Sequence, residues 1–422
     1  MLRRAIQLRH ATALVAGIMI GASIFVQPSE VARLPSVAGV LMVWLAAGVL
    51  TLLGALVIAD LARLMPESGG VYVYLARAFG PAIGFTWGWA MFWTMHTGIV
   101  AAIAIIFARY AAFVVPAGAT GQKAIAIGAV VLLSAINYVG VGAGSRLQTA
   151  FTAAKLLAIA AIVAAGLVFG GRVPEHFQGP ASPPPVSIGI VITALAAGLF
   201  AFGGWHMVSY SAGETVDPER TIPRALLLGT LIVTAAYLAM NAIYLYVLPL
   251  DRVASSSYIA ADFAAALFGR GAGAAMAAVV MFSSAGALAG VILTGPRVYH
   301  AMAQDRLAPR WIAAVHPRFQ TPHRAVVLQA LWAAVLILTG TFRALFTRVV
   351  YTEWIFFGCL AVGLMLLLRR IAVLPAIFAI AAFTVVIEQV AANPRDALFG
   401  LGFVLTGLPV YYVISRRTSS SE

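Results

Sequence analysis

Apolar residues run along this chain in long blocks, and polar and charged residues gather in short stretches between them. A helix needs about 20 predominantly apolar residues to cross the hydrocarbon core of a bilayer. Blocks of about this length occupy residues 11–34, 38–63, 82–115, 124–139, 149–169, 187–211, 224–249, 273–299, 324–340, 350–368, 371–392 and 397–414. The pattern predicts an all-α polytopic membrane protein with about twelve transmembrane helices and no large domain outside the membrane.

The amino-acid composition agrees with this class. Of the 422 residues, 62% are hydrophobic and only 10% are charged. A soluble domain carries roughly 25% charged residues, and a disordered chain carries far less apolar surface than this one. Both alternatives are excluded, and the lipid bilayer is the expected environment of most of the chain.

Three connections between the blocks should carry structure of their own. Gly69–Phe79 predicts a short interfacial helix, Ser256–Phe268 predicts a helix lying over the outer face, and Asp305–Arg324 is the longest basic loop. The basic start of the chain, followed by apolar residues, is similar to a secretory signal. We expect this segment to be retained as the first span, because so many further apolar blocks follow it.

The distribution of Lys and Arg sets the expected orientation. With the N-terminus in the cytoplasm and alternating spans, the inside segments hold most of the 27 basic residues, in agreement with the positive-inside rule. We therefore expect both termini in the cytoplasm and the protein in the cytoplasmic membrane. The same bias accounts for the net charge of +13 without a nucleic-acid partner, because the arginines are scattered between apolar blocks.

Two spans contain clustered glycines, Gly17 and Gly21 in the first and Gly203 and Gly204 in the sixth. Glycine weakens a helix by roughly 1 kcal/mol per residue, so these clusters could break both helices within the membrane. The alternative is close packing of intact helices through small residues. A break at the start of each half of the chain favours a transporter with inverted repeats, residues 1–170 and 186–370, followed by two further spans at 371–415.

Such breaks would suit a zwitterionic ligand. A half-helix that begins near Ser23 would present free N–H groups, which attract a carboxylate. A half-helix that ends near Phe200–Phe202 would present free carbonyl groups, which attract an ammonium group. The two ends together could hold the head group shared by all amino acids without burying a formal protein charge.

At these residues the chain resembles the amino acid–polyamine–organocation superfamily of permeases. Similar segments follow the family's order at 17–25 (GIMIGASIF), 66–72 (PESGGVY), 78–81 (AFGP), 200–205 (FAFGGW), 217–224 (DPERTIPR) and 295–302 (GPRVYHAM). Residues 151–158 (FTAAKLLA) are similar to the fifth span of the L-type amino acid transporters. The resemblance extends from about residue 8 to residue 370.

The resemblance implies a five-plus-five inverted repeat within the predicted fold, discontinuous helices 1 and 6, and transport by alternating access. It implies that the substrate carboxylate meets the backbone amides of Ala22, Ser23 and Ile24. It implies that the substrate amino group meets the backbone carbonyls of Met19, Phe200, Ala201 and Gly203. Phe200 would also gate the bound substrate, and Trp354 would lie at the pocket.

Lys155 lies inside the fifth span, where an ionisable residue is costly and therefore a functional candidate. The alternative is that its side chain snorkels to the nearby membrane boundary. In the family, a lysine at this position occupies the place where sodium-coupled relatives bind sodium. The resemblance implies that its ammonium group joins the first and eighth spans, through backbone near Gly17 or Ile18 and the hydroxyl of Ser283 or Ser284. This arrangement favours sodium-independent exchange, or coupling to protons.

Two further ionisable residues are candidates for coupling or gating. His206 adjoins the break in the sixth span, and a packing role weighs about equally. Glu353 precedes Trp354 in the tenth span, where the L-type branch often has asparagine. An ordinary charge at the outer interface is the preferred interpretation of Glu353, whereas a carboxylate facing the pocket would favour cationic side chains or titrate.

The sequence thus predicts a secondary amino acid transporter, and the nearby Phe200, Phe202 and Trp354 favour neutral amino acids. The alternatives are a cationic amino acid or polyamine carrier and a non-transporting amino acid sensor. We expect neither an enzyme nor a cofactor or metal ion, because no His-Glu-x-x-His motif and no phosphate-binding Gly-x-x-x-x-Gly-Lys-Ser/Thr loop occurs. A channel would show repeated pore-lining groups, which are absent. No disulfide-linked heavy subunit is expected, because Cys359, the only cysteine, lies within a span.

Overall fold

The computed structural model describes residues 6–21, 23–67, 69–139, 144–171, 186–319, 321–340, 342–392 and 394–419. Within these residues the chain is predominantly helical, and the β-contact that occurs is an isolated bridge between Ile6 and Thr215. The α-helices are α1 (Leu8–Met19), α2 (Gln27–Val31), α3 (Val37–Leu64), α4 (Val71–Phe79), α5 (Pro81–Ala90), α6 (His96–Val114), α7 (Ala119–Val139), α8 (Gly144–Phe169), α9 (Ile188–Ala201), α10 (Pro218–Val247), α11 (Leu250–Ser255), α12 (Ile259–Phe268), α13 (Arg270–Gln304), α14 (His323–Thr339), α15 (Phe342–Leu368), α16 (Val373–Ala392) and α17 (Pro394–Ser419). The tighter or wider helical turns are η1 (Ser23–Phe25), η2 (Met91–Met95), η4 (Trp205–Glu214) and η5 (Arg310–Ala313).

The apolar blocks of the sequence become these helices. Nine stretches of the described chain are long and apolar enough to cross a membrane, and they coincide with the first eight predicted spans and the eleventh. The ninth, tenth and twelfth predicted spans coincide with shorter apolar stretches, His323–Thr339, Thr352–Leu368 and Gly400–Ser415. The predicted all-α polytopic membrane class is confirmed, while length and composition alone support nine of the crossings.

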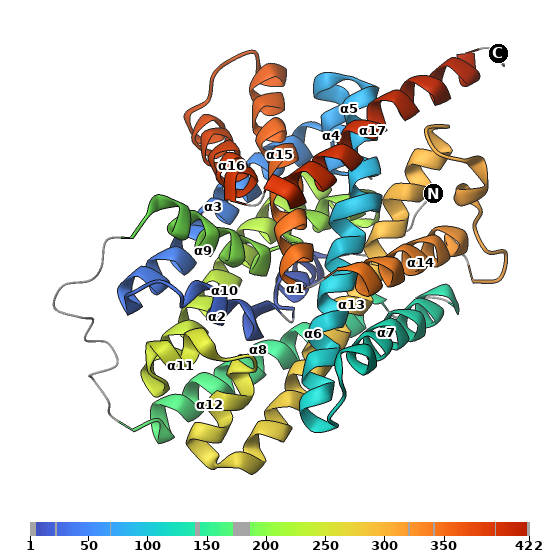
Figure 1. The fold of residues 1–422 in the computed structure, drawn as a ribbon. Coiled ribbons are helices and arrows are strands. Elements are labelled where there is room, and N and C mark those ends of the chain that lie inside the picture. Colours follow the sequence, from blue (N-terminus) through green and yellow to red (C-terminus); the bar gives the residue numbers. More distant parts are fainter. Residues whose placement is uncertain are drawn as a thin grey trace.

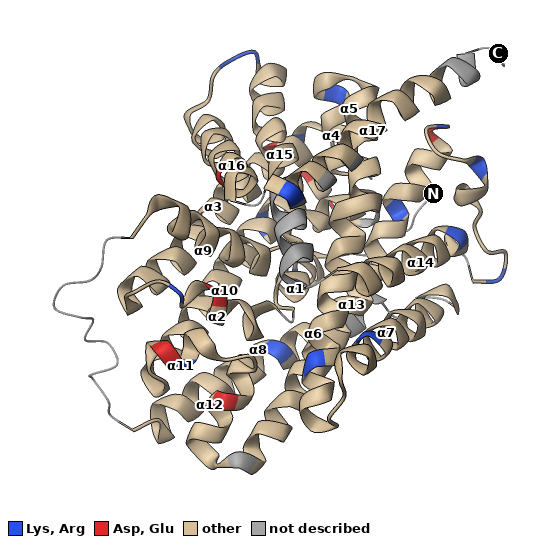
Figure 2. Ribbon diagram, in the orientation of Figure 1, with Lys and Arg blue, Asp and Glu red and all other residues tan. Residues whose placement is uncertain are grey.

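The helices pack into one bundle around α10 and α13. Helix α10 packs against α1, α3 and α8, and α13 packs against α6, α7 and α12. Figure 1 shows α11 and α12 at the opposite end of the molecule from α17 and the connection between α13 and α14. Most charged residues of the described chain lie at helix ends or in connections (Figure 2). This distribution is expected of helices that cross a bilayer, because a charge inside the hydrocarbon is costly.

Both predicted extramembrane helices are present, as α4 and α12. Helix α4 is bounded by Gly70 and Gly80, whose φ angles of 50° and 93° lie in the region that favours glycine. In its first turn, the Tyr72 hydroxyl donates to Asp305 at the end of α13, over 2.8 Å. Burial, together with this hydrogen bond, raises the pKa of Tyr72 above its ordinary value. The hydroxyl therefore keeps its proton at neutral pH and ties α4 to α13.

The first and sixth spans are discontinuous, as the glycine clusters predict. Helix α1 ends at Met19, and the N–H of Gly21 turns back to the Met19 carbonyl over 2.7 Å. Helix α9 ends at Ala201, and Gly204 follows with a φ of 91°. Intact helices packed through their glycines are therefore excluded. The segments just outside these two spans also meet, because the N–H of Val216, after η4, donates to the carbonyl of Ile6, before α1, over 3.0 Å.

Candidate functional site

The two breaks line one cavity. The space between them, about 480 Å³, includes solvent-filled space where the cavity opens. Its walls come from α1 and η1, from α9 and the turn into η4, and from α6, α13 and α15. The lining residues are Ile18, Met19, Gly21, Ser23, Ile99, Ile103, Leu199, Phe200, Ala201, Gly203, Gly204, Met207, Val291, Glu353 and Trp354.

The N–H groups at the first break are available to a ligand. Ser23 opens η1 in the wall of the cavity, and neither its N–H nor that of Ile24 has a hydrogen-bond acceptor among the described residues. The Tyr110 hydroxyl donates to the Phe25 carbonyl over 2.7 Å and so fixes η1 against α6. Ala22, the third predicted amide, lies outside the described residues. Free N–H groups at the start of a helical turn suit an anionic oxygen.

The predicted carbonyl groups are partly occupied by donors of the protein itself. The Met19 oxygen accepts from the N–H of Gly21 over 2.7 Å and from the Tyr237 hydroxyl over 2.6 Å. The Ala201 oxygen accepts from the same hydroxyl over 3.0 Å. A carbonyl oxygen offers two lone pairs. An arriving amino group can therefore use Ala201 directly, whereas at Met19 it must displace a donor.

Sequence reasoning did not single out Tyr237, which the structure places between the two breaks. The residue is fully buried in α10 and does not belong to the cavity wall itself. The signal that could have found it is a tyrosine near the middle of the apolar block 224–249. A buried tyrosine hydroxyl usually finds a hydrogen-bond partner, and the free carbonyls of broken helices are such partners in an apolar span.

The aromatic residues at the second break divide between the cavity and the core. Phe200 and Trp354 line the cavity, and the Phe200 carbonyl accepts from the N–H of Gly203 over 3.0 Å. Phe202 lies behind the wall and packs against Tyr237, with ring centroids 4.9 Å apart. The prediction that Phe200 and Trp354 lie at one pocket therefore agrees with the geometry, whereas Phe202 is a core residue.

Lys155 projects from α8 onto the end of α1. Its ammonium nitrogen donates to the Gly17 carbonyl over 3.2 Å and to the Ile20 carbonyl over 3.0 Å. Only 4% of the residue is exposed, so the snorkelling alternative is excluded. The predicted hydrogen bond to the Gly17 carbonyl is present. The second carbonyl that accepts from Lys155 is that of Ile20 rather than Ile18. One cation thus binds the last turn of α1 and the break that follows it.

The predicted link from Lys155 to the serines of the eighth span is not formed. Ser284 donates to the Val280 carbonyl within α13, and Ser283 donates to the Gly21 carbonyl over 3.5 Å. Within the described residues neither hydroxyl bonds Lys155. The Lys155 ammonium group donates to the backbone carbonyls of Gly17 and Ile20. The ammonium nitrogen instead approaches α13 at Gly286, where an added Cβ would lie 3.7 Å away.

The two remaining candidates lie in different environments. Glu353 is 5% exposed and lines the cavity, so the preferred interpretation as a charge at the outer interface is wrong. His206 does not line the cavity, and its ring packs against Trp205 and Phe357 with centroids 5.6 and 5.0 Å away. That position matches the packing alternative. Across the described chain, His, Cys, Asp and Glu side chains form no group of three that could hold a metal ion.

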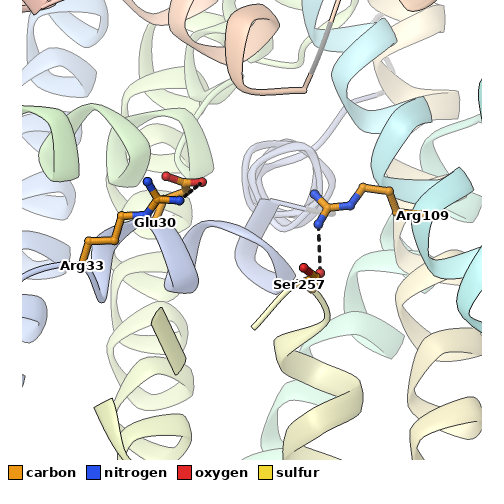
Figure 3. Close-up of polar contacts among 4 residues, drawn as sticks. All are labelled: Glu30, Arg33, Arg109 and Ser257. Atoms are coloured by element: carbon orange, nitrogen blue, oxygen red, sulfur yellow. Dashed lines mark hydrogen bonds and ion pairs between the residues drawn. The ribbon is translucent and has the colours of Figure 1, made fainter. Parts of the chain in front are cut away.

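A tether joins α6 to the loop between α11 and α12. The Arg109 guanidinium donates to the Ser257 carbonyl over 3.1 Å and lies 5.9 Å from the ring centroid of Tyr258. Figure 3 shows Arg109 reaching to this loop, together with the separate ion pair of Glu30 and Arg33 at 3.2 Å. Helix α11 packs against α2, the segment that follows the first break. The tether therefore holds the loop after α11, the helix that packs against the continuation of the first broken span.

Comparison with known proteins gives the family. A sequence model described as amino acid permease matches residues 6–419. The chain is 31% identical to the serine/threonine exchanger SteT of Bacillus subtilis (strain 168), over 99% of this chain and 98% of that protein. It is 29% identical to the b(0,+)-type amino acid transporter 1 of Mus musculus, over 98% and 88% of the two chains. It is 30% identical to the large neutral amino acids transporter small subunit 2 of Mus musculus, over 98% and 81%.

These relatives are transporters and exchangers rather than enzymes, in agreement with the prediction from sequence. The match covers the described chain from the start of α1 to the end of α17. Its segments at 17–25 and 200–205 contain the two breaks that line the cavity. The chain therefore belongs to the amino acid permease family and is a multi-pass integral membrane protein.

Proposed function

We propose that this protein carries amino acids across the cytoplasmic membrane by secondary active transport with alternating access. The observation that carries the proposal is the single cavity lined by the breaks of both α1 and α9. The free N–H groups of Ser23 and Ile24 suit a carboxylate, and the Ala201 carbonyl suits an ammonium group. The printed names of the relatives, which include a serine/threonine exchanger, support the amino acid class.

Lys155 supports transport that does not depend on sodium. Its ammonium group uses the carbonyls of Gly17 and Ile20, which are the kind of oxygen ligands that a sodium ion would need. A second cation beside it would be repelled, most strongly where no water screens the two charges. Exchange of one substrate for another, or coupling to protons, fits this arrangement better than sodium coupling.

The gating elements follow from the same geometry. Phe200 lies in the cavity wall at the end of α9 and is 6% exposed, which suits a residue that closes over a bound substrate. The two broken helices would move as parts of an inverted repeat, residues 1–170 against residues 186–370. Both termini would lie in the cytoplasm, which is supported by the excess of Lys and Arg in the loops on that side.

The lining supports neutral amino acids as the first substrate class to test. Apart from Glu353, the residues that line the cavity are uncharged, and most of them are apolar. The carboxylate of Glu353 favours a second candidate, a cationic amino acid or a polyamine. A non-transporting sensor would bind an amino acid in the same cavity and would show no flux.

Counterflow in proteoliposomes tests the proposed function. Purified protein is reconstituted, the vesicles are loaded with an unlabelled amino acid, and uptake of radiolabelled amino acids is measured across a panel. Uptake should saturate, should accelerate when substrate is present inside, and should not change when choline replaces sodium. A monodisperse protein with no counterflow for any amino acid would overturn the proposal. Binding without flux would point to the sensor.

A further inference from the structure

Glu353 is the only ionisable residue among those that line the cavity. It is 5% exposed, and no hydrogen bond or ion pair joins its carboxylate to another group of the described chain. The next residue along α15, Trp354, lines the same space. A buried acidic group therefore faces the space between the two breaks without a protein partner.

Among the described residues, no group on the elements packed against α15 forms an ion pair with Glu353. Helix α9 and η2 contain no ionisable side chain. Tyr210 on η4 is an electrostatic neighbour of Glu353, but it is a neutral phenol whose hydroxyl lies 3.8 Å from the sulfur of Met91. On α3, α4 and α6 the charged and titratable groups that have hydrogen-bond or ion-pair partners bond elsewhere: Asp60 with Arg63, Arg77 with Glu67, Tyr72 with Asp305, His96 with the Val291 carbonyl, Tyr110 with the Phe25 carbonyl and Arg109 with the Ser257 carbonyl. Tyr74 is a further phenol on α4, Glu388 on α16 is itself acidic, and Arg395 on α17 is exposed. The His206 ring packs against Phe357 of α15 and makes no ion pair with Glu353.

An ionised carboxylate enclosed in protein without a partner costs several kcal/mol. Water can solvate Glu353 whenever the cavity opens to either side of the membrane. Once the cavity closes around a substrate, that water is lost and the negative charge must be neutralised. A proton can neutralise it, and so can an ammonium or guanidinium group at the end of a cationic side chain.

We propose that Glu353 carries one exchangeable positive charge in each loaded transport step. With a neutral amino acid, the carboxylate takes up a proton from the water on one side and releases it to the water on the other. With a cationic amino acid, the side-chain cation pairs with the ionised carboxylate and no proton moves. The loaded carrier then has the same net charge in both cases. This inference rests on the proposed function and deepens it, because it assigns both substrate classes to one site.

Exchange between the two classes tests the inference. Proteoliposomes are loaded with lysine and a pH-sensitive dye, and leucine, or the neutral amino acid with the fastest counterflow, is added outside. Each neutral molecule that enters should bring a proton, while each lysine leaves without one, so the lumen acidifies in step with uptake. Exchange of the neutral amino acid for itself should leave the luminal pH unchanged. An imposed membrane potential should not alter the rate of mixed exchange, because both directions carry equal charge.

Three variants separate this role from a structural one. Glu353→Gln should abolish the acidification and should lower the ratio of lysine to neutral counterflow by about tenfold or more, as expected for loss of a charged hydrogen bond. Glu353→Asp keeps a carboxylate and should retain both properties in part. Glu388→Gln, on α16 and outside the cavity lining, is the matched control and should leave both unchanged. Monodisperse elution of each variant checks that it is folded.

The outcomes distinguish this inference from the proposed function. Mixed exchange without acidification, transport of neutral amino acids but of no cationic one, or an unchanged counterflow ratio in Glu353→Gln would overturn the inference while amino acid transport stands. Absence of counterflow for every amino acid would instead overturn the proposed function. Acidification that disappears in Glu353→Gln and persists in Glu388→Gln would support the inference.

Discussion

The hydroxyl oxygen of Tyr237 lies 2.6 Å from the carbonyl oxygen of Met19, the last residue of α1. The same hydroxyl lies 3.0 Å from the carbonyl oxygen of Ala201, the last residue of α9. Both broken helices therefore end against one side chain of α10. Because a hydroxyl has a single proton, it can donate fully to one carbonyl at a time. The other carbonyl oxygen can then accept a further hydrogen bond. A ligand's amino group that binds one carbonyl would shift this proton toward the other.

Removal of this hydroxyl should weaken substrate binding. In Tyr237→Phe the ring remains, but Met19 and Ala201 lose their shared donor. A buried carbonyl without a partner costs about 1–3 kcal/mol, and the break would rearrange to find one. We expect the apparent KM for the transported amino acid to rise about tenfold or more. Counterflow measured over a series of substrate concentrations gives this value.

Tyr244→Phe provides the matched control on the same helix. The Tyr244 hydroxyl is buried and has no hydrogen-bond partner within the described residues. Its removal leaves no carbonyl unsatisfied, so the KM should stay as in the wild-type protein. An unchanged KM in Tyr237→Phe, or an equal rise in both variants, would show that the hydroxyl does not position the breaks.

Replacement of Lys155 should impair transport more than stability. Lys155→Met preserves most of the apolar stem but removes both bonds to α1, at Gly17 and Ile20. The packing of α8 against α1 and α10 is retained, so we expect the protein to remain folded. The end of α1 loses its cation, and counterflow should fall about tenfold or more, in line with the loss of charge-assisted hydrogen bonds. Initial rates and thermal unfolding, measured on the same preparation, separate the two effects.

Lys123→Met is the corresponding control outside the site. Lys123 also donates to a backbone carbonyl, that of Leu338, over 2.6 Å, but at an exposed position. Surface interactions of this kind contribute little. The rate of Lys123→Met should match that of the wild-type protein. If Lys155→Met transported at the wild-type rate, its buried ammonium group would have only a packing role.

Much of the fold was predictable because its signals are local. The length of each apolar block predicts a crossing, and the clusters around Gly17 and Gly203 predict breaks at the places where α1 and α9 end. The prediction of the short α4 between Gly70 and Gly80 succeeds for the same reason, since the glycines mark both ends. None of these features depends on which way a helix is turned.

The wall of the cavity was harder to predict because a span that is apolar all round does not reveal its inner face. Successive residues of a helix point about 100° apart. Phe200 and Phe202 therefore face different ways, and only Phe200 lines the cavity. For Glu353 the sequence favoured the outer interface over the cavity, and only the packing of α15 places it inside. Tyr237 escaped prediction for the same reason.

Gly204 allows the sixth span to turn, so a side chain there should disrupt the site. Its φ of 91° lies in a region that costs other residues about 1–2 kcal/mol. An added Cβ would also collide with Cγ2 of Ile18 on α1. We expect Gly204→Ala to lower the melting temperature and to abolish counterflow. Gly189→Ala, where an added Cβ meets nothing within 4 Å, should do neither. Wild-type counterflow in Gly204→Ala would show that the turn tolerates a side chain.

The tether at Arg109 should hold the segment formed by α11 and α12 in place. Arg109→Gln removes the charged donor to the Ser257 carbonyl and the cation above the Tyr258 ring. A cation above an exposed aromatic ring contributes about 0.5–1 kcal/mol, and a hydrogen bond from a charged group contributes about 1.5–3 kcal/mol. Amide hydrogens of residues 250–268 should therefore exchange about tenfold faster in the variant, because the segment opens more often. Hydrogen-exchange mass spectrometry of the purified protein measures this directly.

Arg33→Gln shows whether the effect belongs to the tether or to lost positive charge in general. Arg33 is half exposed and pairs with Glu30, three residues earlier, at 3.2 Å (Figure 3). An exposed pair of this kind contributes little, so exchange in residues 250–268 should stay at the wild-type rate. Since α11 packs against α2, faster opening in Arg109→Gln should also expose the amides of α2. If exchange accelerated equally in both variants, net charge rather than the Ser257 contact would control the segment.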